Sequence, residues 1–164
     1  MKYYIAYGSN LSVSQMAYRC PDAKIVGRAV LKDWKLVFRI HATIEPEIGS
    51  TVPVLVWKIS DSDEQRLDRY EGFPKYYVKE TIPVNVTGLR SGKQKELNAM
   101  VYIMAKGRPI IPPTIEYYGI IMEGYKRFGF NTKILKDAFS DAFLGIPTEP
   151  EPEPEYGHKY PAGF

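Results

Sequence analysis

Two short segments hold the residues best suited to chemistry: a polar loop at residues 7–11 and the acid Glu71. The loop joins a predicted strand to a helix that Ser12 can cap, so backbone N–H groups and the positive end of the helix converge on it. Its glycine permits close approach by a ligand, and its serine and asparagine add side-chain donors. The pattern predicts a binding site for a carboxylate. The candidate binding residues are Tyr7, Gly8, Ser9, Asn10 and Leu11.

Other interpretations of this loop compete with a binding site. Glycine, serine and asparagine are also the commonest turn residues, so the segment can be a turn without any function. A nucleotide site is disfavoured because neither GxGxxG nor GxxxxGK[ST] follows the strand. Ser9 is a poor candidate nucleophile, since neither His41 nor His158 has the sequence context of its base.

Glu71 is expected in or just past the last turn of a short helix that ends before Gly72. The negative end of the helix dipole and burial against Tyr70 or Phe73 would both raise the pKa of this carboxyl group. A raised pKa suits proton transfer near neutral pH. The competing interpretation is a solvated surface glutamate, which is the usual fate of this residue type.

The surrounding elements predict an α+β fold: a small mixed, mainly antiparallel β-barrel or sheet with flanking helices. Successive strands without intervening helices disfavour a doubly wound parallel sheet. The domain is expected over residues 1–147, followed by a Glu/Pro-rich tail at 148–164 that stays extended and solvated. The expected strands are 2–7, 24–31, 35–40, 52–59, 76–86 and 96–105, with a turn at Asp33-Trp34, and the expected helices are 12–20, 61–70, 114–129 and 131–145.

Composition limits the remaining classes. The 164 residues are 45% hydrophobic and 25% charged, which suffices for one domain with a core. One cysteine excludes an intramolecular disulfide, and with two histidines it leaves no basis for a metal site. No segment resembles a signal peptide or a membrane span, so we expect a cytoplasmic protein without membrane partners.

The charge pattern gives a further expectation. The net charge is +3, but four Glu and one Lys make residues 149–164 −3, which leaves +6 on the rest. Modest positive charge suits anionic substrates. Because the basic residues are scattered, we expect no nucleic-acid partner.

Several ordered motifs together resemble the γ-glutamylcyclotransferases of the AIG2-like or butirosin-pathway cyclotransferase-like fold. The loop YGSNL is moderately specific alone, and its combination with a downstream LDxxEG in this order is specific. A threonine stands at position 114, where the family often has serine, and the tail is not explained by the resemblance. The matching segments are 7–11, 42–44, 56–59, 67–72, Tyr102 and Pro113-Thr114-x-x-Tyr117.

The resemblance implies an enzyme, free of metal and cofactor, that converts a γ-glutamyl amide into 5-oxoproline and a free amine. The α-amine of the substrate would attack its own γ-carbonyl group, with Glu71 as general base and then acid. The 7–11 loop, Tyr102 and Tyr117 would bind the glutamyl group.

Two alternatives remain open. The same fold could remove a γ-glutamyl protecting group from a secondary metabolite, or the protein could be a non-catalytic member that binds a small anion or a protein. The sequence identifies neither the leaving amine nor the oligomeric state.

Overall fold

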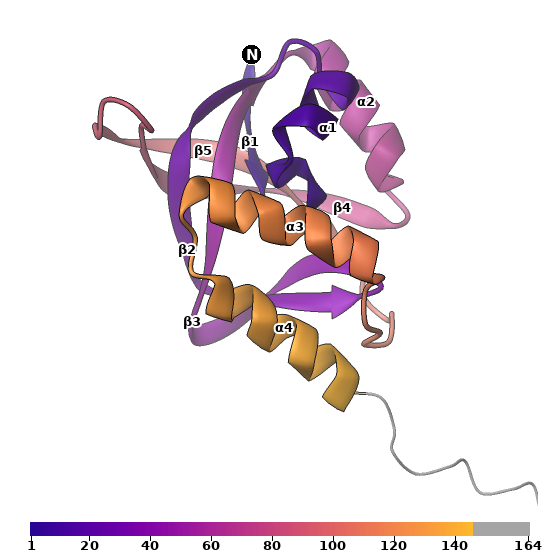
Figure 1. Ribbon diagram of the computed structural model, residues 1–164. Coiled ribbons are helices and arrows are strands. Elements are labelled where there is room, and N and C mark those ends of the chain that lie inside the picture. The colour runs from indigo at the N-terminus through magenta and orange to yellow at the C-terminus, as the bar shows by residue number, and fades with distance from the viewer. Residues whose placement is uncertain (146–164) are drawn as a thin grey trace, which may run out of the picture.

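The computed structural model describes residues 1–145, so the expectations for residues 146–164, including the tail, lie outside this part (Figure 1). Five strands and four α-helices, with one short 3-10 helix η1, follow one another along the chain. They are β1 (Lys2–Ala6), η1 (Ser9–Leu11), α1 (Val13–Arg19), β2 (Lys24–Arg39), β3 (His41–Ile59), α2 (Asp61–Glu71), β4 (Tyr77–Thr87), β5 (Gln94–Met104), α3 (Ile115–Phe128) and α4 (Thr132–Leu144).

The strands close into a barrel in the order β1-β3-β2-β4-β5. All pairs are antiparallel except β1 with β5, which are parallel and meet at Tyr4 and Met100. The α+β class and the mainly antiparallel barrel are therefore confirmed, and β4 and β5 form the expected hairpin. Helices α3 and α4 lie along one side of this barrel, with α1 and α2 near one end of it (Figure 1).

The expected turn at Asp33-Trp34 is wrong, because β2 runs through it as one strand. Asp33 adopts a φ of 64°, and its carboxylate accepts a hydrogen bond from the N–H of Gly49 at 2.9 Å. The pairing steps from Lys32–Thr51 to Trp34–Pro46, so the partner strand absorbs the extra residues in a bulge. The reversal to β3 occurs at Ile40 instead, and β3 begins well before the expected residue 52.

The helix ends follow the expected local signals. Ser60 and Asp63 form a reciprocal capping box at the start of α2, and Gly72 ends it with a φ of 64°. Thr114 caps α3, and Asn131 caps α4. Ser12 accepts the Gln15 N–H at the start of α1.

Close contact between α3 and the 7–11 loop depends on Gly124. A Cβ atom at this position would lie 2.6 Å from the Cβ of Leu11, whose side chain is fully buried. Any side chain at 124 would therefore push η1 away from α3. The buried Leu11 side chain thus packs the loop against α3.

Within residues 1–145, no helix is both long and apolar enough to cross a membrane.

We predict that Gly124→Ala destabilises the protein by about 1–2 kcal/mol, because overpacking against Leu11 outweighs the higher helix propensity of alanine. Urea unfolding measures the difference. Gly119→Ala is the matched control: it lies on the same helix with no atom within 4 Å of the added Cβ, so the same propensity gain should stabilise the protein. Equal stabilisation by both substitutions would contradict this account of the contact.

Candidate active site

One cavity of about 350 Å³ collects nearly all the residues singled out in the sequence. Its lining includes Glu71 from the end of α2, the start of the 7–11 loop, Tyr102 from β5 and Tyr117 from the first turn of α3. The barrel thus brings together segments that are up to about a hundred residues apart. The lining consists of Tyr4, Ile5, Tyr7, Gly8, Ser9, Asn10, His41, Ala42, Arg69, Tyr70, Glu71, Gly72, Tyr76, Tyr77, Tyr102 and Tyr117.

Leu11 is the one candidate that does not line the cavity. Its N–H donates to the Gly8 carbonyl at 3.0 Å, and its side chain is buried against α3. The Ser12 N–H likewise donates to Ser9. The expectation that the Leu11 N–H meets a ligand is therefore corrected, because the 3-10 turn uses it. The N–H groups of Ser9 and Asn10 open this turn, where no preceding turn supplies acceptors.

The side chain of Asn10 holds the loop in place. Its amide donates to the Tyr4 hydroxyl at 2.9 Å, and its side-chain oxygen accepts from Arg19 at 2.6 Å. Its backbone carbonyl accepts from the Trp57 indole at 3.2 Å. These contacts fix the direction of the loop backbone, so its N–H groups rather than the Asn10 amide are the donors best placed for a ligand.

Glu71 is the last residue of α2, and it lies on the cavity wall. Burial raises the pKa of its carboxyl group to about 7, and the nearby Arg19 charge acts in the opposite direction. Glu71 is thus a half-buried acid on a cavity wall and not a fully exposed one. A carboxyl group that titrates near neutrality can both accept and donate a proton there.

Tyrosines form much of the remaining wall. Burial raises the pKa of Tyr7, Tyr77, Tyr102 and Tyr117, so all four stay neutral at physiological pH. Tyr7 donates to the Tyr102 carbonyl at 2.5 Å, and Tyr77 donates to the Ala42 carbonyl at 2.7 Å. Tyr117 instead accepts from the Ala42 N–H at 3.1 Å, which leaves its own proton available to a ligand.

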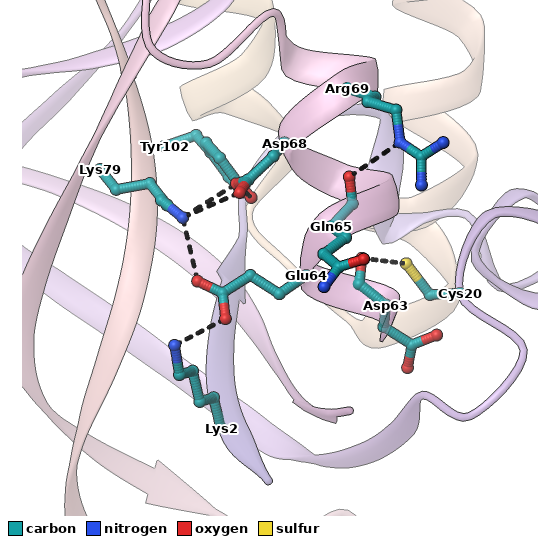
Figure 2. A network of polar contacts seen from close by, with 9 residues as sticks. All are labelled: Lys2, Cys20, Asp63, Glu64, Gln65, Asp68, Arg69, Lys79 and Tyr102. Carbon is teal, nitrogen blue, oxygen red and sulfur yellow. Dashed lines mark hydrogen bonds and ion pairs between the residues drawn. The ribbon is translucent and has the colours of Figure 1, made fainter. Parts of the chain in front are cut away.

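A chain of charged groups anchors Tyr102 and the helix that carries Glu71 (Figure 2). The Tyr102 hydroxyl donates to Asp68 at 2.6 Å, and Lys79 on β4 pairs with Asp68 at 2.9 Å. Lys79 also pairs with Glu64 at 3.0 Å, and Glu64 pairs with Lys2 on β1 at 2.6 Å. These partners lower the pKa of Glu64 and raise that of Lys79. Because Asp68 lies one turn before Glu71, the network fastens that end of α2 to the barrel.

The cavity wall also contains His41 and Tyr76, which the sequence did not single out, and Arg108 lies against Tyr76 outside this lining. His41 Nδ1 lies 3.2 Å from the Tyr76 hydroxyl, and the Arg108 guanidinium lies 3.7 Å from the centre of the Tyr76 ring. Burial and the Arg108 charge lower the pKa of His41. No local sequence pattern marks His41, or Tyr76 and Tyr77 near the start of β4, as functional residues. Only the folded barrel brings them into the cavity wall.

Among residues 1–145, no three His, Cys, Asp or Glu side chains lie close enough together to hold a metal ion. The cavity instead offers a titratable acid, backbone donors and neutral hydroxyl groups. Such a set can move a proton and bind a small polar molecule with a negative group.

A closed barrel whose cavity holds an acid, backbone donors and neutral hydroxyl groups is suited to an enzyme that acts on small molecules, and comparison with known proteins identifies its family. Residues 4–125 match the sequence model described as "Gamma-glutamyl cyclotransferase, AIG2-like". The chain belongs to this family.

Characterised relatives agree with this assignment. A protein named γ-glutamylcyclotransferase from Bos taurus is 32% identical over an alignment of 138 positions, and the match covers 77% of this chain and 71% of the relative. The Homo sapiens protein of the same name is 33% identical over 139 residues with the same coverage. A solved structure titled γ-glutamyl cyclotransferase superposes with a TM-score of 0.69 at 31% identity, covering 84% of this chain and 85% of that one.

We predict that Asp68→Asn lowers the free energy of unfolding by about 1–3 kcal/mol, because it removes a charged acceptor from both Lys79 and Tyr102. Chemical denaturation measures the change. Asp137→Asn is the control, since it removes an exposed ion pair with Lys133 within α4 and should cost much less. Comparable losses in the two variants would show that the network does not anchor α2.

Proposed function

We propose that this protein is a γ-glutamylcyclotransferase, which converts a γ-glutamyl amide into 5-oxoproline and a free amine. The observation that carries the proposal is the Glu71 carboxyl group, which has a pKa of about 7 and lines the same cavity as residues 7–10 of the loop. Membership of the family supports the same reaction. The substrate class is a small γ-glutamyl peptide or γ-glutamyl amine.

The proposed reaction uses the substrate's own α-amine as nucleophile. This nitrogen forms a bond to the γ-carbonyl carbon, and the resulting tetrahedral intermediate then loses the amide nitrogen. Glu71 accepts a proton from the α-ammonium group and gives it to the departing nitrogen. The attacking nitrogen loses its second proton as the ring amide forms, and the released amine takes up that proton, so the reaction consumes no net proton. Folding the substrate into a near-attack conformer supplies much of the rate enhancement. The ring closure itself requires no protein nucleophile.

The remaining residues bind and stabilise the substrate in this proposal. The N–H groups of Ser9 and Asn10, at the positive end of η1 and α1, bind the α-carboxylate or the developing oxyanion. Tyr117 donates its free hydroxyl proton to the same substrate. Tyr7 and Tyr102 enclose the glutamyl group, and Gly8 keeps the loop open to it, since its missing Cβ would lie 3.4 Å from the Tyr117 hydroxyl.

The leaving amine is proposed to lie against His41 and Tyr76 of the cavity wall, with Arg108 behind Tyr76. A secondary metabolite carrying a γ-glutamyl protecting group would use the same acid and the same loop. Turnover of γ-glutamyl-alanine, glutathione and a γ-glutamyl-amine, compared side by side, distinguishes these substrates.

We predict that Glu71→Gln folds normally but loses about 10²–10⁴ in kcat, since glutamine cannot transfer the proton. Mass spectrometry of 5-oxoproline formed from γ-glutamyl-alanine measures the loss. Glu123→Gln, an exposed acid on α3, is the matched control and should retain full activity. Retained turnover by Glu71→Gln would refute the proposed role of this residue.

The raised pKa of Glu71 also predicts two opposite pH effects. Activity, measured as kcat/KM, should rise with pH through about 7, because the free enzyme must present the carboxylate. Stability should change the other way, since folding favours the protonated acid. The wild-type protein should lose stability relative to Glu71→Gln as pH rises from about 4.5 to about 7.

Melting temperatures of the two proteins across this range, beside the rate profile, test the prediction. A stability difference that does not vary with pH would show that the Glu71 carboxyl group is not desolvated in the folded protein.

A further inference from the structure

Arg19 is the last residue of α1 and contacts both halves of the site without lining the cavity. Its Nη1 atom donates to the Asn10 side-chain oxygen at 2.6 Å and to the Ser9 hydroxyl at 3.3 Å. Its guanidinium carbon lies 3.5 Å from the centre of the Tyr70 ring. Tyr70 immediately precedes Glu71 on α2. One planar cation therefore joins the loop to the end of the helix that carries the acid.

The groups that surround Glu71 explain why the charge of Arg19 matters for the pKa of this acid. Most of the ionisable groups close to it are tyrosines, and each has a pKa raised by burial and by Glu71 itself, so none supplies a positive charge. These tyrosines are Tyr4 on β1, Tyr7 after β1, Tyr77 on β4, Tyr102 on β5 and Tyr117 on α3.

The other charged groups near Glu71 form ion pairs or hydrogen bonds with other residues, or favour a neutral form. Lys79 and Asp68 pair with each other. The Arg69 side chain bends back to the Gln65 carbonyl (Figure 2), and burial beside Arg108 lowers the pKa of His41, which favours its neutral form. Within residues 1–145, Arg19 is the cation whose charge opposes the rise in the pKa of Glu71.

We propose that Arg19 is a positioning residue of this site: it fixes the 7–11 loop relative to Glu71 and keeps that acid available as a base. The inference rests on the proposed function for its kinetic consequence. Substitution separates the positioning effect of Arg19 from its electrostatic effect, because lysine keeps the charge but has neither the planar fork nor the stacking surface of arginine. Methionine removes both and keeps an unbranched side chain of similar reach.

The test compares Arg19→Lys and Arg19→Met with the wild-type protein in the 5-oxoproline assay over a range of pH. Arg19→Lys should raise KM for γ-glutamyl-alanine about three- to tenfold while the midpoint of the pH profile stays in place. Arg19→Met should raise KM similarly and also move the midpoint upward by about one pH unit. Arg66→Met, an exposed cation on α2, is the control for loss of one positive charge and should change neither quantity.

A uniform loss of kcat in Arg19→Met, with KM and the pH midpoint unchanged, would overturn the proposal, because a merely structural role predicts that result. If Arg19→Met does not fold, Arg19→Lys decides the positioning role through KM alone, and an unchanged KM overturns it.

Carboxyl NMR titration of Glu71 separates this proposal from the proposed function. If the wild-type protein forms no 5-oxoproline from any γ-glutamyl amide, the proposed function fails, yet the Glu71 titration midpoint can still be compared with that of the Arg19→Met protein. An upward shift supports the electrostatic role of Arg19, and coincident midpoints overturn it.

Discussion

The architecture of this site depends on keeping one carboxyl group partly out of water at the C-terminal end of a helix. Burial raises the pKa of Glu71 to about 7 against the effect of Arg19, so a desolvated acid in this place costs folding free energy increasingly as pH rises from about 4.5 to about 7. Other contacts must therefore hold the helix end against the barrel. Lys79 on β4 does so through ion pairs with Asp68 and Glu64, which lie one and two turns before Glu71 on α2. Gly72 then turns the chain away immediately after the acid.

Barrel closure imposes a matching constraint on the loop that lines the cavity together with Glu71. The loop leaves β1, which lies between β3 and β5, so its start is fixed by two neighbouring strands. Its far side is fixed by tight contact between Leu11 and Gly124 on α3. The barrel itself closes through a similar contact, since a Cβ at Gly27 would lie 2.2 Å from the Thr87 carbonyl oxygen. Close approach of the backbone at these two glycines thus helps to hold the loop in the wall of the cavity that Glu71 also lines.

Local patterns predicted most elements and the place of Glu71 at the end of α2, since caps, turn residues and apolar spacing act within a few positions of the chain. The sequence failed where the outcome depends on distant partners. Asp33 resembles a turn residue, but its carboxylate binds Gly49 and the strand continues. Leu11 belongs to a loop suited to binding, yet α3 buries it. The wall contributed by His41 and Tyr77 follows from barrel register, which no local motif encodes.

The choice of tyrosine for so much of the cavity wall follows from the same constraint. A wall of lysines or arginines would hold Glu71 as a carboxylate with a low pKa, which binds a proton too weakly for transfer at neutral pH. Buried tyrosines supply hydroxyl groups without charge. The hydroxyl groups of Tyr7 and Tyr77 donate to backbone carbonyls, whereas the Tyr117 hydroxyl accepts from the Ala42 N–H and can donate its proton to a ligand. Among residues 1–145, the charge that opposes the effect of burial on the pKa of Glu71 comes from Arg19 behind the loop, while Arg69 on the cavity wall donates to the Gln65 carbonyl. Most of the polar groups around Glu71 are therefore uncharged, and this leaves Glu71 able to accept and to donate a proton near neutral pH.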